Sequence, residues 1–351
     1  MRPLPKNRIL IIVSALLLQL LLSCAMMKED RTDCPDCRNP LHVTLRYDYN
    51  TARANMFSDH VEEATCFVVD AVSGKVVDVQ TARNTSTAAP LRDASFGFNF
   101  EGLTAGDYRL YALGRSQGDA HHEIQLPDVA EDISRLQFAL PTDADGNPMA
   151  QRLDTLWNAL QPVDVTMQND APAQATVSLM RLTNDLNVLL FRTDTPTANS
   201  HQRYQVTVTD SHAVLGADNQ PRQEQPVVYR PFASWTTETY TRADGDGVLA
   251  ERNAHYDLSL SRLIQHEQAS KNAHLHIVDT DSGTEVVNID LCYYLALARN
   301  AYETRNYDVQ EYLDREYDYR MAFWLDGNNW RYMTISISVL SWTLRIQNEM
   351  L

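Results

Sequence analysis

Short runs of alternating apolar and polar residues recur along most of this 351-residue chain, and they constrain its fold more than any other feature. In residues 41–47, Leu41, Val43, Leu45 and Tyr47 fall on one side of an extended backbone, which is typical of a half-buried strand. Runs of the same kind cover residues 96–100, 108–114, 204–210, 255–263, 330–340 and 341–346. The runs 65–70 and 75–80 around Ser73-Gly74 predict a hairpin, and residues 274–291 predict a second one with an Asp-Ser-Gly turn. Many short strands separated by turn residues, without alternating helices, predict an all-β protein made of β-sandwiches.

The chain length and one turn-rich segment suggest two domains. At roughly 150 residues per domain, the body has room for two hydrophobic cores. Residues 141–148, with the sequence PTDADGNP, are the best boundary. We therefore expect an N-terminal β-sandwich over 41–148 and a C-terminal β-sandwich over 149–351 with loop and short helical insertions. Helical spacing favours helices within 291–299 and 309–320, and 152–162 is expected to be a connector or one short helix.

The first 23 residues have the layout of a secretory signal peptide. Arg2, Lys6 and Arg8 form a positive region, and an apolar run follows at residues 9–22. That run is too short to span a ~30 Å hydrocarbon core comfortably, and its flanks are those of a cleaved signal. Residues 1–23 are therefore expected to direct export and then to be removed.

Cys24 follows Leu21-Leu22-Ser23, and this segment resembles the lipobox of bacterial lipoproteins. The resemblance implies cleavage between Ser23 and Cys24, diacylglycerol on the Cys24 thiol and an acyl chain on the new amino terminus. Three chains on one residue would hold a soluble body firmly, since each buried CH₂ contributes ~0.8 kcal/mol. We expect a lipidated tether over 24–40. The alternative is an ordinary cleaved signal followed by a chance cysteine.

The charge of the mature body limits its partners. Without residues 1–23 it carries 27 basic and 46 acidic residues, a net charge of −19. Nucleic acid and anionic lipid head groups are poor partners for such a body. The acidity suits a protein held near a membrane by covalent lipid.

Four cysteines remain once Cys24 is assigned to lipid. Cys34 and Cys37 form a CxxC pair that is expected to be a local disulfide or two plain thiols. A disulfide that reaches Cys66 or Cys292 is the second alternative. Zinc or redox chemistry is a third, although half a zinc site is missing and no thioredoxin-like strand and helix flank the pair.

Common sequence signatures of hydrolases, nucleotide-binding proteins and zinc proteases are missing or incomplete. It contains no GxSxG elbow and no glycine-rich phosphate loop. His266-Glu267 begins like the HExxH zinc motif, but Ser270 stands where the second histidine is needed. We expect a protein that is not an enzyme and that carries no cofactor beyond the lipid on Cys24.

Three segments have side chains of metal-ligand type in unfavourable patterns. His274 and His276 share one face of a predicted strand without a third ligand. The neighbours His121-His122-Glu123 lie in a predicted loop, where their side chains diverge. Residues 143–147 alternate oxygen ligands like the start of a calcium loop with Asp154 twelfth, but Pro148 replaces the turn glycine. We expect no metal at any of them, with metal binding as the alternative.

Residues 41–77, 177–190 and 311–346 form three blocks that together resemble the FimB-type fimbrial anchor family, the fimbrillin-associated anchor lipoproteins of Bacteroidales. Residues 41–77 contain a strand that ends in Tyr-Asp-Tyr-Asn, a turn led by Phe57 and a hairpin. Residues 177–190, VSLMRLTNDLNVLL, are similar to the strand pair that opens the family's second domain. Residues 311–346 carry Leu-Asp-Arg-Glu and paired tryptophans, although Ser338–Trp342 replaces the Asn-Gly turn of the family pattern.

The resemblance implies two transthyretin-like β-sandwich domains in tandem. It also implies a surface-facing outer-membrane lipoprotein that anchors a fimbrial polymer, with some control of fibre length. The implied partners are fimbrial shaft or accessory subunits. Strand addition to an open sheet edge suits such docking because it needs no catalytic residues. The strand-prone run 333–346 is one candidate for the docking strand, and a plain core strand is the alternative.

Two further hypotheses concern sorting and an alternative function. Lys28-Glu29-Asp30 resembles the lysine and acids that accompany surface export of lipoproteins in this bacterial group, and a chance charge cluster is the alternative. The rival function is a fimbrial tip or adhesin subunit that binds a host ligand or carbohydrate. In that case Tyr229, Trp235 and Tyr240 would form an exposed aromatic platform.

Overall fold

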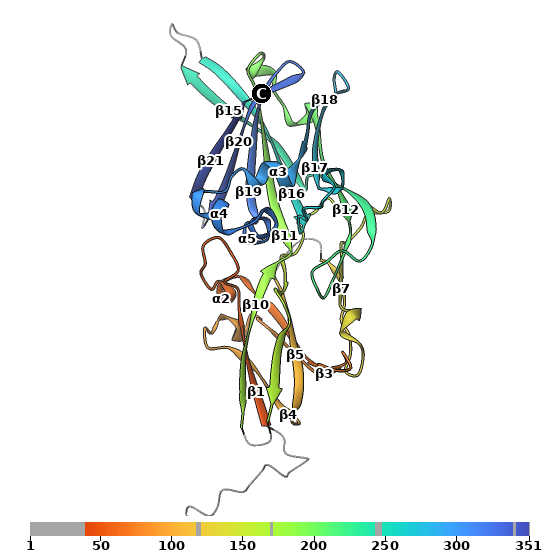
Figure 1. The fold of residues 1–351 in the computed structure, drawn as a ribbon. Coiled ribbons are helices and arrows are strands. Elements are labelled where there is room, and N and C mark those ends of the chain that lie inside the picture. The colour runs from red at the N-terminus through yellow and green to blue at the C-terminus, as the bar shows by residue number, and fades with distance from the viewer. Residues whose placement is uncertain (1–38, 117–120, 169–170, 243–247, 340–341, 351) are drawn as a thin grey trace, which may run out of the picture.

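The computed structural model describes residues 39–116, 121–168, 171–242, 248–339 and 342–350. It is an elongated molecule in which two β-sandwiches follow each other along one axis (Figure 1). The all-β class expected from the sequence is confirmed. The predicted signal peptide, the cleavage and lipidation site at Ser23 and Cys24, the Lys28–Asp30 segment and the Cys34/Cys37 pair lie outside the described residues.

The N-terminal sandwich is built from one eight-stranded sheet that folds over on itself. Its strands follow the order β3-β2-β5-β8-β10-β1-β4, and β9 also pairs with β5. The strand bounds are β1 Asn39–Arg46, β2 Glu63–Asp70, β3 Val76–Arg83, β4 Gly97–Leu103, β5 Gly106–Arg115, β8 Leu156–Ala159, β9 Val163–Met167 and β10 Ala173–Arg181. The short helix α2 (Phe57–His60) precedes β2.

Strand β10 joins the two layers of this sandwich. Its residues 173–178 run parallel to residues 41–46 of β1, while Leu179–Arg181 pair with β8 in the other layer. The residues predicted to face inwards are all buried: Leu41, Val43 and Leu45 of β1, and Tyr47 directly after it. They pack against apolar side chains of β2, β4, β5 and β10.

The outer face of β2 and β5 is covered by a second apolar cluster. Phe67 of β2 and Leu113 of β5 pack there against Leu136, Phe138 and Leu215. The covering chain forms a three-stranded sheet of β6 (Glu123–Gln125), β7 (Gln137–Ala139) and β13 (Val214–Gly216), in the order β13-β7-β6. We call this the bridging sheet, because β13 comes from the second half of the chain.

The C-terminal sandwich packs two separate sheets against each other. A six-stranded sheet has the order β15-β16-β11-β19-β20-β21, and a four-stranded sheet has the order β14-β12-β17-β18. The strand bounds are β11 Thr183–Arg192, β12 Tyr204–His212, β14 Glu224–Tyr229, β15 Ala233–Arg242, β16 Val248–Ser261, β17 His274–Asp279, β18 Thr284–Asp290, β19 Asp318–Asp326, β20 Asn329–Val339 and β21 Trp342–Met350.

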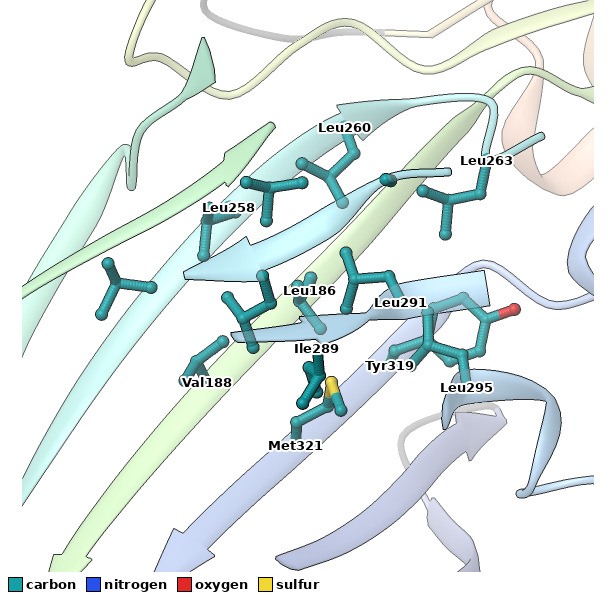
Figure 2. Close-up of a cluster of buried hydrophobic side chains, with 14 of the residues drawn as sticks. Leu186, Val188, Leu258, Leu260, Leu263, Ile289, Leu291, Leu295, Tyr319 and Met321 are labelled. Atoms are coloured by element: carbon teal, nitrogen blue, oxygen red, sulfur yellow. The ribbon is translucent and has the colours of Figure 1, made fainter. Parts of the chain in front are cut away.

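Alternating side chains from both sheets fill the core of the C-terminal sandwich. Leu186 and Val188 of β11 and Met321 of β19 meet Ile289 of β18 in the space between the layers, and Leu295 of a short helix closes one end (Figure 2). The predicted hairpin within 274–291 is confirmed as β17 and β18. Its Asp-Ser-Gly turn is explained by Gly283, whose φ of 70° favours glycine.

Three short helices lie between β18 and β19. They are α3 (Leu291–Ala296), α4 (Ala301–Asn306) and α5 (Val309–Arg315). Helices α3 and α5 lie within the expected ranges 291–299 and 309–320, whereas α4 was not predicted and residues 318–320 begin β19. Each helix is preceded by a capping residue, Asp290, Asn300 and Asp308 respectively, whose side chain accepts a hydrogen bond from a backbone N–H of the first turn. Asn300 and Glu303 complete a capping box, which fixes the start of α4.

The structure differs from the sequence-based predictions in three places near the middle of the chain. Residues 156–159, expected within a connector or short helix, form strand β8 because they pair with both β5 and β10. The expected boundary at residue 148 lies too early, since β8, β9 and β10 still belong to the N-terminal sheet. Residues 177–190 are not a strand pair of one domain: β10 ends the first sandwich and β11 begins the second, with the buried Leu182 between them.

Candidate functional site: the seam between the sandwiches

The three sequence blocks singled out above meet where the two sandwiches touch. We call this contact the seam. The loop that follows β1 reaches it from the N-terminal sandwich, while α4, α5 and the start of β19 reach it from the C-terminal sandwich (Figure 1). Its residues are Tyr47, Tyr49, Thr51, Arg53, Arg181, Tyr302, Tyr307, Arg315, Glu316 and Tyr317.

Hydrogen bonds tie the Tyr-Asp-Tyr-Asn loop to the Leu-Asp-Arg-Glu segment across the seam. The Thr51 N–H donates to the carbonyl oxygen of Arg315 at 3.2 Å, and the Thr51 hydroxyl donates to Glu316 Oε2 at 3.0 Å. Glu316 is almost completely buried. Two segments separated by more than 260 residues in the chain are therefore joined by both backbone and side-chain bonds.

Arginine–tyrosine stacking closes the rest of the seam. The Arg315 guanidinium lies 3.9 Å from the ring centre of Tyr49 and 4.6 Å from that of Tyr307. Arg53 lies 4.2 Å from the ring centre of Tyr302, and its Nη2 donates to the Tyr307 hydroxyl at 2.8 Å. Burial raises the pKa of Tyr49 to about 12, although Arg315 opposes the shift. The ring therefore stays neutral beside the cation, which suits cation–π attraction.

The bridging sheet makes a second connection, well separated in sequence from the Tyr-Asp-Tyr-Asn loop. Its β13 pairs with β7, so the C-terminal half completes a sheet begun in the N-terminal half. Buried amides lock it further: Asn158 Nδ2 donates to Asn219 Oδ1 at 2.7 Å, and Asn219 Nδ2 donates to the Ala159 carbonyl at 2.8 Å. Arg262, which pairs with Asp314 at 2.7 Å, also donates to the Asn219 carbonyl. Two connections of this kind oppose bending between the sandwiches.

The described cysteines are reduced and enclosed. Cys66 and Cys292 are free, fully buried and in separate cores. Burial raises the pKa of both thiols far above the ordinary value, so neither is a reactive thiolate at neutral pH. The prediction of a local Cys34–Cys37 disulfide concerns residues outside the described part of the chain and stays a prediction.

His122 and Asp154 form a buried polar cluster that the sequence did not suggest. His122 Nδ1 lies 2.6 Å from Asp154 Oδ1, and Arg115 Nη2 donates to Asp154 Oδ2 at 2.7 Å. Burial alone would raise the pKa of Asp154, but the bonds and charge of His122, aided by Arg115, hold it well below its usual range. The pair fixes the chain around residues 121–122 against the N-terminal sheet.

The residues of the weak calcium-like pattern make other contacts in the structure. Asp154, the twelfth residue of the pattern, is occupied in the cluster just described. Asp143 Oδ1 accepts the backbone N–H groups of Asp145 and Asn147, each at 3.0 Å, as in a turn. His276 bonds to Glu285 at 2.6 Å on the outer side of its hairpin. Among the described residues, no three His, Cys, Asp or Glu side chains gather as metal ligands.

The aromatic platform expected for an adhesin is not formed by the predicted residues. Tyr229 is buried, and its hydroxyl accepts the Ser261 N–H. Trp235 is 37% exposed, but one face of its ring is stacked on His255 at 4.9 Å. Tyr240 is exposed and donates to Glu238. The prediction was therefore wrong for Tyr229, and the three residues do not form one shared aromatic surface.

An aromatic ladder that the sequence analysis missed crosses the outer face of the six-stranded sheet. Phe191, Trp324 and Tyr332 occupy paired positions on β11, β19 and β20, and their rings stack at 4.6 and 4.4 Å. Because each ring covers the face of its neighbour, the ladder turns mainly ring edges outwards. A groove of about 540 Å³ lies beside it, lined by both acids and arginines, including Asp257, Asp318 and Arg320.

Open sheet edges are a second feature of the C-terminal sandwich. The candidate docking run 333–346 is divided in the structure: β20 lies inside the sheet, and β21 is the last strand of its side. Within the described residues, β21 pairs with β20 alone, and β15 ends the opposite side of the same sheet. The run therefore supplies one interior strand and one edge strand, and its use as a docking strand stays a prediction.

A local sequence signal marks helix α4 of the seam, which strand alternation alone does not predict. Asn300 and Glu303 have the spacing of a capping box, which marks the start of α4. The pairing of Arg53 with Tyr302 and Tyr307 has no such signal, because it joins positions about 250 residues apart. Within the described part of the chain, no helix is both long and apolar enough to cross a membrane.

Comparisons with known proteins agree with this architecture. The family model described as "Fimbrillin-A associated anchor proteins Mfa1 and Mfa2" matches residues 31–348. An adhesin candidate of Bacteroides thetaiotaomicron has a similar structure, with 26% sequence identity and a TM-score of 0.69, covering 90% of this chain and 100% of that one. The fimbrial anchor protein Mfa2 of Porphyromonas gingivalis shares the fold at 14% identity and a TM-score of 0.58, covering 89% and 100%. No protein of curated function matches the chain.

Proposed function

Because the chain belongs to the family of fimbrillin-A associated anchor proteins Mfa1 and Mfa2, we propose that it is an outer-membrane lipoprotein that anchors a fimbrial polymer at the cell surface. Its partners are fimbrial subunits, and the role requires no catalysis. Family membership is the observation that carries the proposal. The lipobox-like segment at Cys24 supplies the membrane attachment.

The polarity of the molecule supports this arrangement. Strand β1 begins at the end of the N-terminal sandwich that lies farthest from the C-terminal sandwich (Figure 1). Asn39 lies fifteen positions after Cys24, and a fully extended tether of that length reaches at most about 50 Å. A lipid on Cys24 would therefore hold the N-terminal sandwich near the membrane and leave the C-terminal sandwich free to meet a fimbrial subunit.

The anchoring proposal is tested by removing the acylated side chain. A Cys24→Ala variant should leave the outer-membrane fraction, and fibres should be shed into the medium. Pull-down of the acylated protein should recover fimbrial subunits. If Cys24→Ala stays in the outer membrane and the fibres stay on the cell, the lipid anchor is ruled out.

We propose that the fimbrial subunit docks by adding a strand along β21. Edge strands offer unpaired N–H and C=O groups to an incoming strand, and such main-chain bonding needs little sequence specificity. Only alternate residues of an edge strand direct their N–H groups outwards. A proline scan of Trp342–Met350 should therefore reduce subunit capture at alternate positions. The same scan along β15 is the matched control and should leave capture unchanged.

A base subunit that occupies one end of the polymer also limits its growth. Cells without this protein should carry fibres that are longer on average and more easily detached, as measured by electron microscopy and by shearing. Fibres of unchanged length that detach easily would remove the length-control part of the proposal and retain the anchor.

A further inference from the structure

The first strand of the body lies in the interior of its sheet. Strand β1 has β10 on one side and β4 on the other. Its pairing with β10 is parallel and continuous from Leu41↔Ala173 to Arg46↔Ser178, and its pairing with β4 is antiparallel over Asn39–Thr44. The inward side chains Leu41, Val43 and Leu45 are at most 2% exposed. Strand β1 is therefore held by two ladders and by the core.

The strand next to β1 continues directly into the other sandwich. Strand β10 ends at Arg181, the buried Leu182 follows, and β11 begins at Thr183. Inside the C-terminal sandwich β11 runs parallel to β19, in register from Asp185↔Asp318 to Arg192↔Leu325. The strands β1, β10 and β11 all run along the long axis of the molecule (Figure 1). Two successive parallel pairs thus line the axis from one end to the other.

We propose that β1 and β10 form a shear clamp that carries mechanical load from the fimbria to the membrane. The direction of the load rests on the anchoring function proposed above. A lipid tether pulls on the start of β1, and a fibre attached to the C-terminal sandwich pulls the other way. Because β10 is covalently continuous with β11, the load on the C-terminal sandwich reaches the far end of β10. Adjacent parallel strands are then pulled in opposite directions along their own axes.

The direction of pulling decides how the ladder fails. When force acts along the strands, all of the hydrogen bonds between β1 and β10 are strained together, and sliding must break them almost simultaneously. When force separates two strands from one end, each bond breaks in turn and carries the whole load alone. Sliding β1 out would also expose its buried leucine and valine side chains to water, which opposes release further. The observed topology places the tether where the ladder is strongest.

Single-molecule pulling tests the clamp on the mature chain without lipid. Cys24, Cys34 and Cys37 are replaced by serine, and one handle is attached to the amino terminus. In the first variant, Ser282→Cys in the exposed β17–β18 turn receives the second handle, so that force passes along β1 and through both sandwiches. Cys66 and Cys292 are fully buried and do not compete for the handle.

The second variant loads the same strand by peeling. Gly102→Cys lies beside Leu103, which pairs with Asn39, so the two handles sit at the same end of neighbouring strands β1 and β4. A Cβ atom at position 102 meets no other atom within 4 Å, which leaves open space for the small cysteine side chain. Chemical unfolding should give the same stability for both variants, which confines any difference in force to the direction of pulling.

The clamp predicts that the Ser282→Cys variant withstands a rupture force several-fold higher than the Gly102→Cys variant at the same loading rate. Equal forces, or a lower force for Ser282→Cys because another part of the molecule yields first, would overturn it. The measurement uses neither membrane nor fimbria. If the two rupture forces do not differ as predicted, the anchoring proposal is unaffected. If the anchoring proposal fails, the measured resistance of β1 and β10 remains, but the load proposed for it does not.

Discussion

The N-terminal sandwich is a single sheet folded over on itself, whereas the C-terminal sandwich packs two sheets that share no strand. In the first, β10 belongs to both layers, and the outer face of β2 and β5 is covered by the bridging sheet. In the second, the outer face of the six-stranded sheet carries the stacked ladder of Phe191, Trp324 and Tyr332. The first sandwich therefore has a covered sheet face, and the second has an aromatic outer face. Both keep edge strands: β3 and β4 end the first sheet, and β15 and β21 end the six-stranded sheet.

This difference suits the role proposed above, in which the protein links a membrane to a polymer. In that role the domain next to the tether benefits from shared strands and covered faces, because these resist deformation. The domain next to the polymer needs an edge that a second chain can reach. The seam and the bridging sheet then decide whether the two domains behave as one body. The following predictions test how separate the sandwiches are.

The largest effect is expected at Arg262, which ties the C-terminal core to the bridging sheet. Its guanidinium pairs with Asp314 at 2.7 Å, and both side chains are at most 8% exposed. Arg262→Met leaves a buried carboxylate without its cation and should lower the free energy of unfolding by about 3–5 kcal/mol. Urea unfolding measures this loss. The exposed pair Arg109–Asp164 is the control, and Arg109→Ala should cost only about 0–1 kcal/mol.

Matched core substitutions test whether the sandwiches unfold together. Leu45→Ala in β1 and Leu190→Ala in β11 both remove fully enclosed side chains, and each should cost about 2–5 kcal/mol. If the seam makes one cooperative unit, both variants shift the same single unfolding transition in calorimetry. Two transitions, each shifted by only one of the variants, would show that the sandwiches are independent.

Acid should weaken the two sandwiches through different buried carboxylates. Asp154 in the first sandwich and Asp279 in the second both have a pKa below the ordinary value. Burial raises the pKa of each carboxyl, but hydrogen bonds lower it more. These bonds come from His122 and Arg115 to Asp154, and from Arg203 to Asp279. Their stabilisation is present above the unfolded pKa of about 3.9 and is lost as the pH falls below it. Asp154→Asn should flatten the stability profile below pH about 4, and Asp279→Asn should do the same.

The acid profiles also report on the coupling between the sandwiches. For a single cooperative unit, either asparagine variant changes the acid dependence of the same transition, as followed by circular dichroism. An effect of Asp154→Asn that leaves a second transition untouched would contradict the coupling inferred from the seam.

The smallest effect is expected from one hydroxyl in the seam. Tyr307→Phe removes the oxygen that accepts two bonds from Arg53 and keeps the ring beneath Arg315. The loss should be about 1 kcal/mol. Tyr49→Phe is the matched control, since the Arg315 contact with Tyr49 is through the ring face, and it should cost less. Equal costs would mean that stacking alone stabilises the seam.

Local patterns in the sequence were enough for much of the fold. The alternation of Leu41, Val43 and Leu45 predicted a buried strand face, and the Ser-Gly turns predicted the hairpins β2–β3 and β17–β18, because both signals act over a few residues. The family-like blocks were also recognisable without coordinates. Residues 156–159 were misjudged because their partners, β5 and β10, are distant in the sequence, and such pairing overrides local preference.

The sequence by itself determined the strand-rich architecture, the acidic body and the family resemblance, since these depend on residue type and short spacing. Only the tertiary structure decided that β10 and β11 belong to different sandwiches and that Tyr49 and Thr51 meet Arg315 and Glu316 across the seam. It also decided that β1 lies between two partners. These features depend on long-range contacts, whose energies are set by which distant segments fold together and leave no pattern within any one of them.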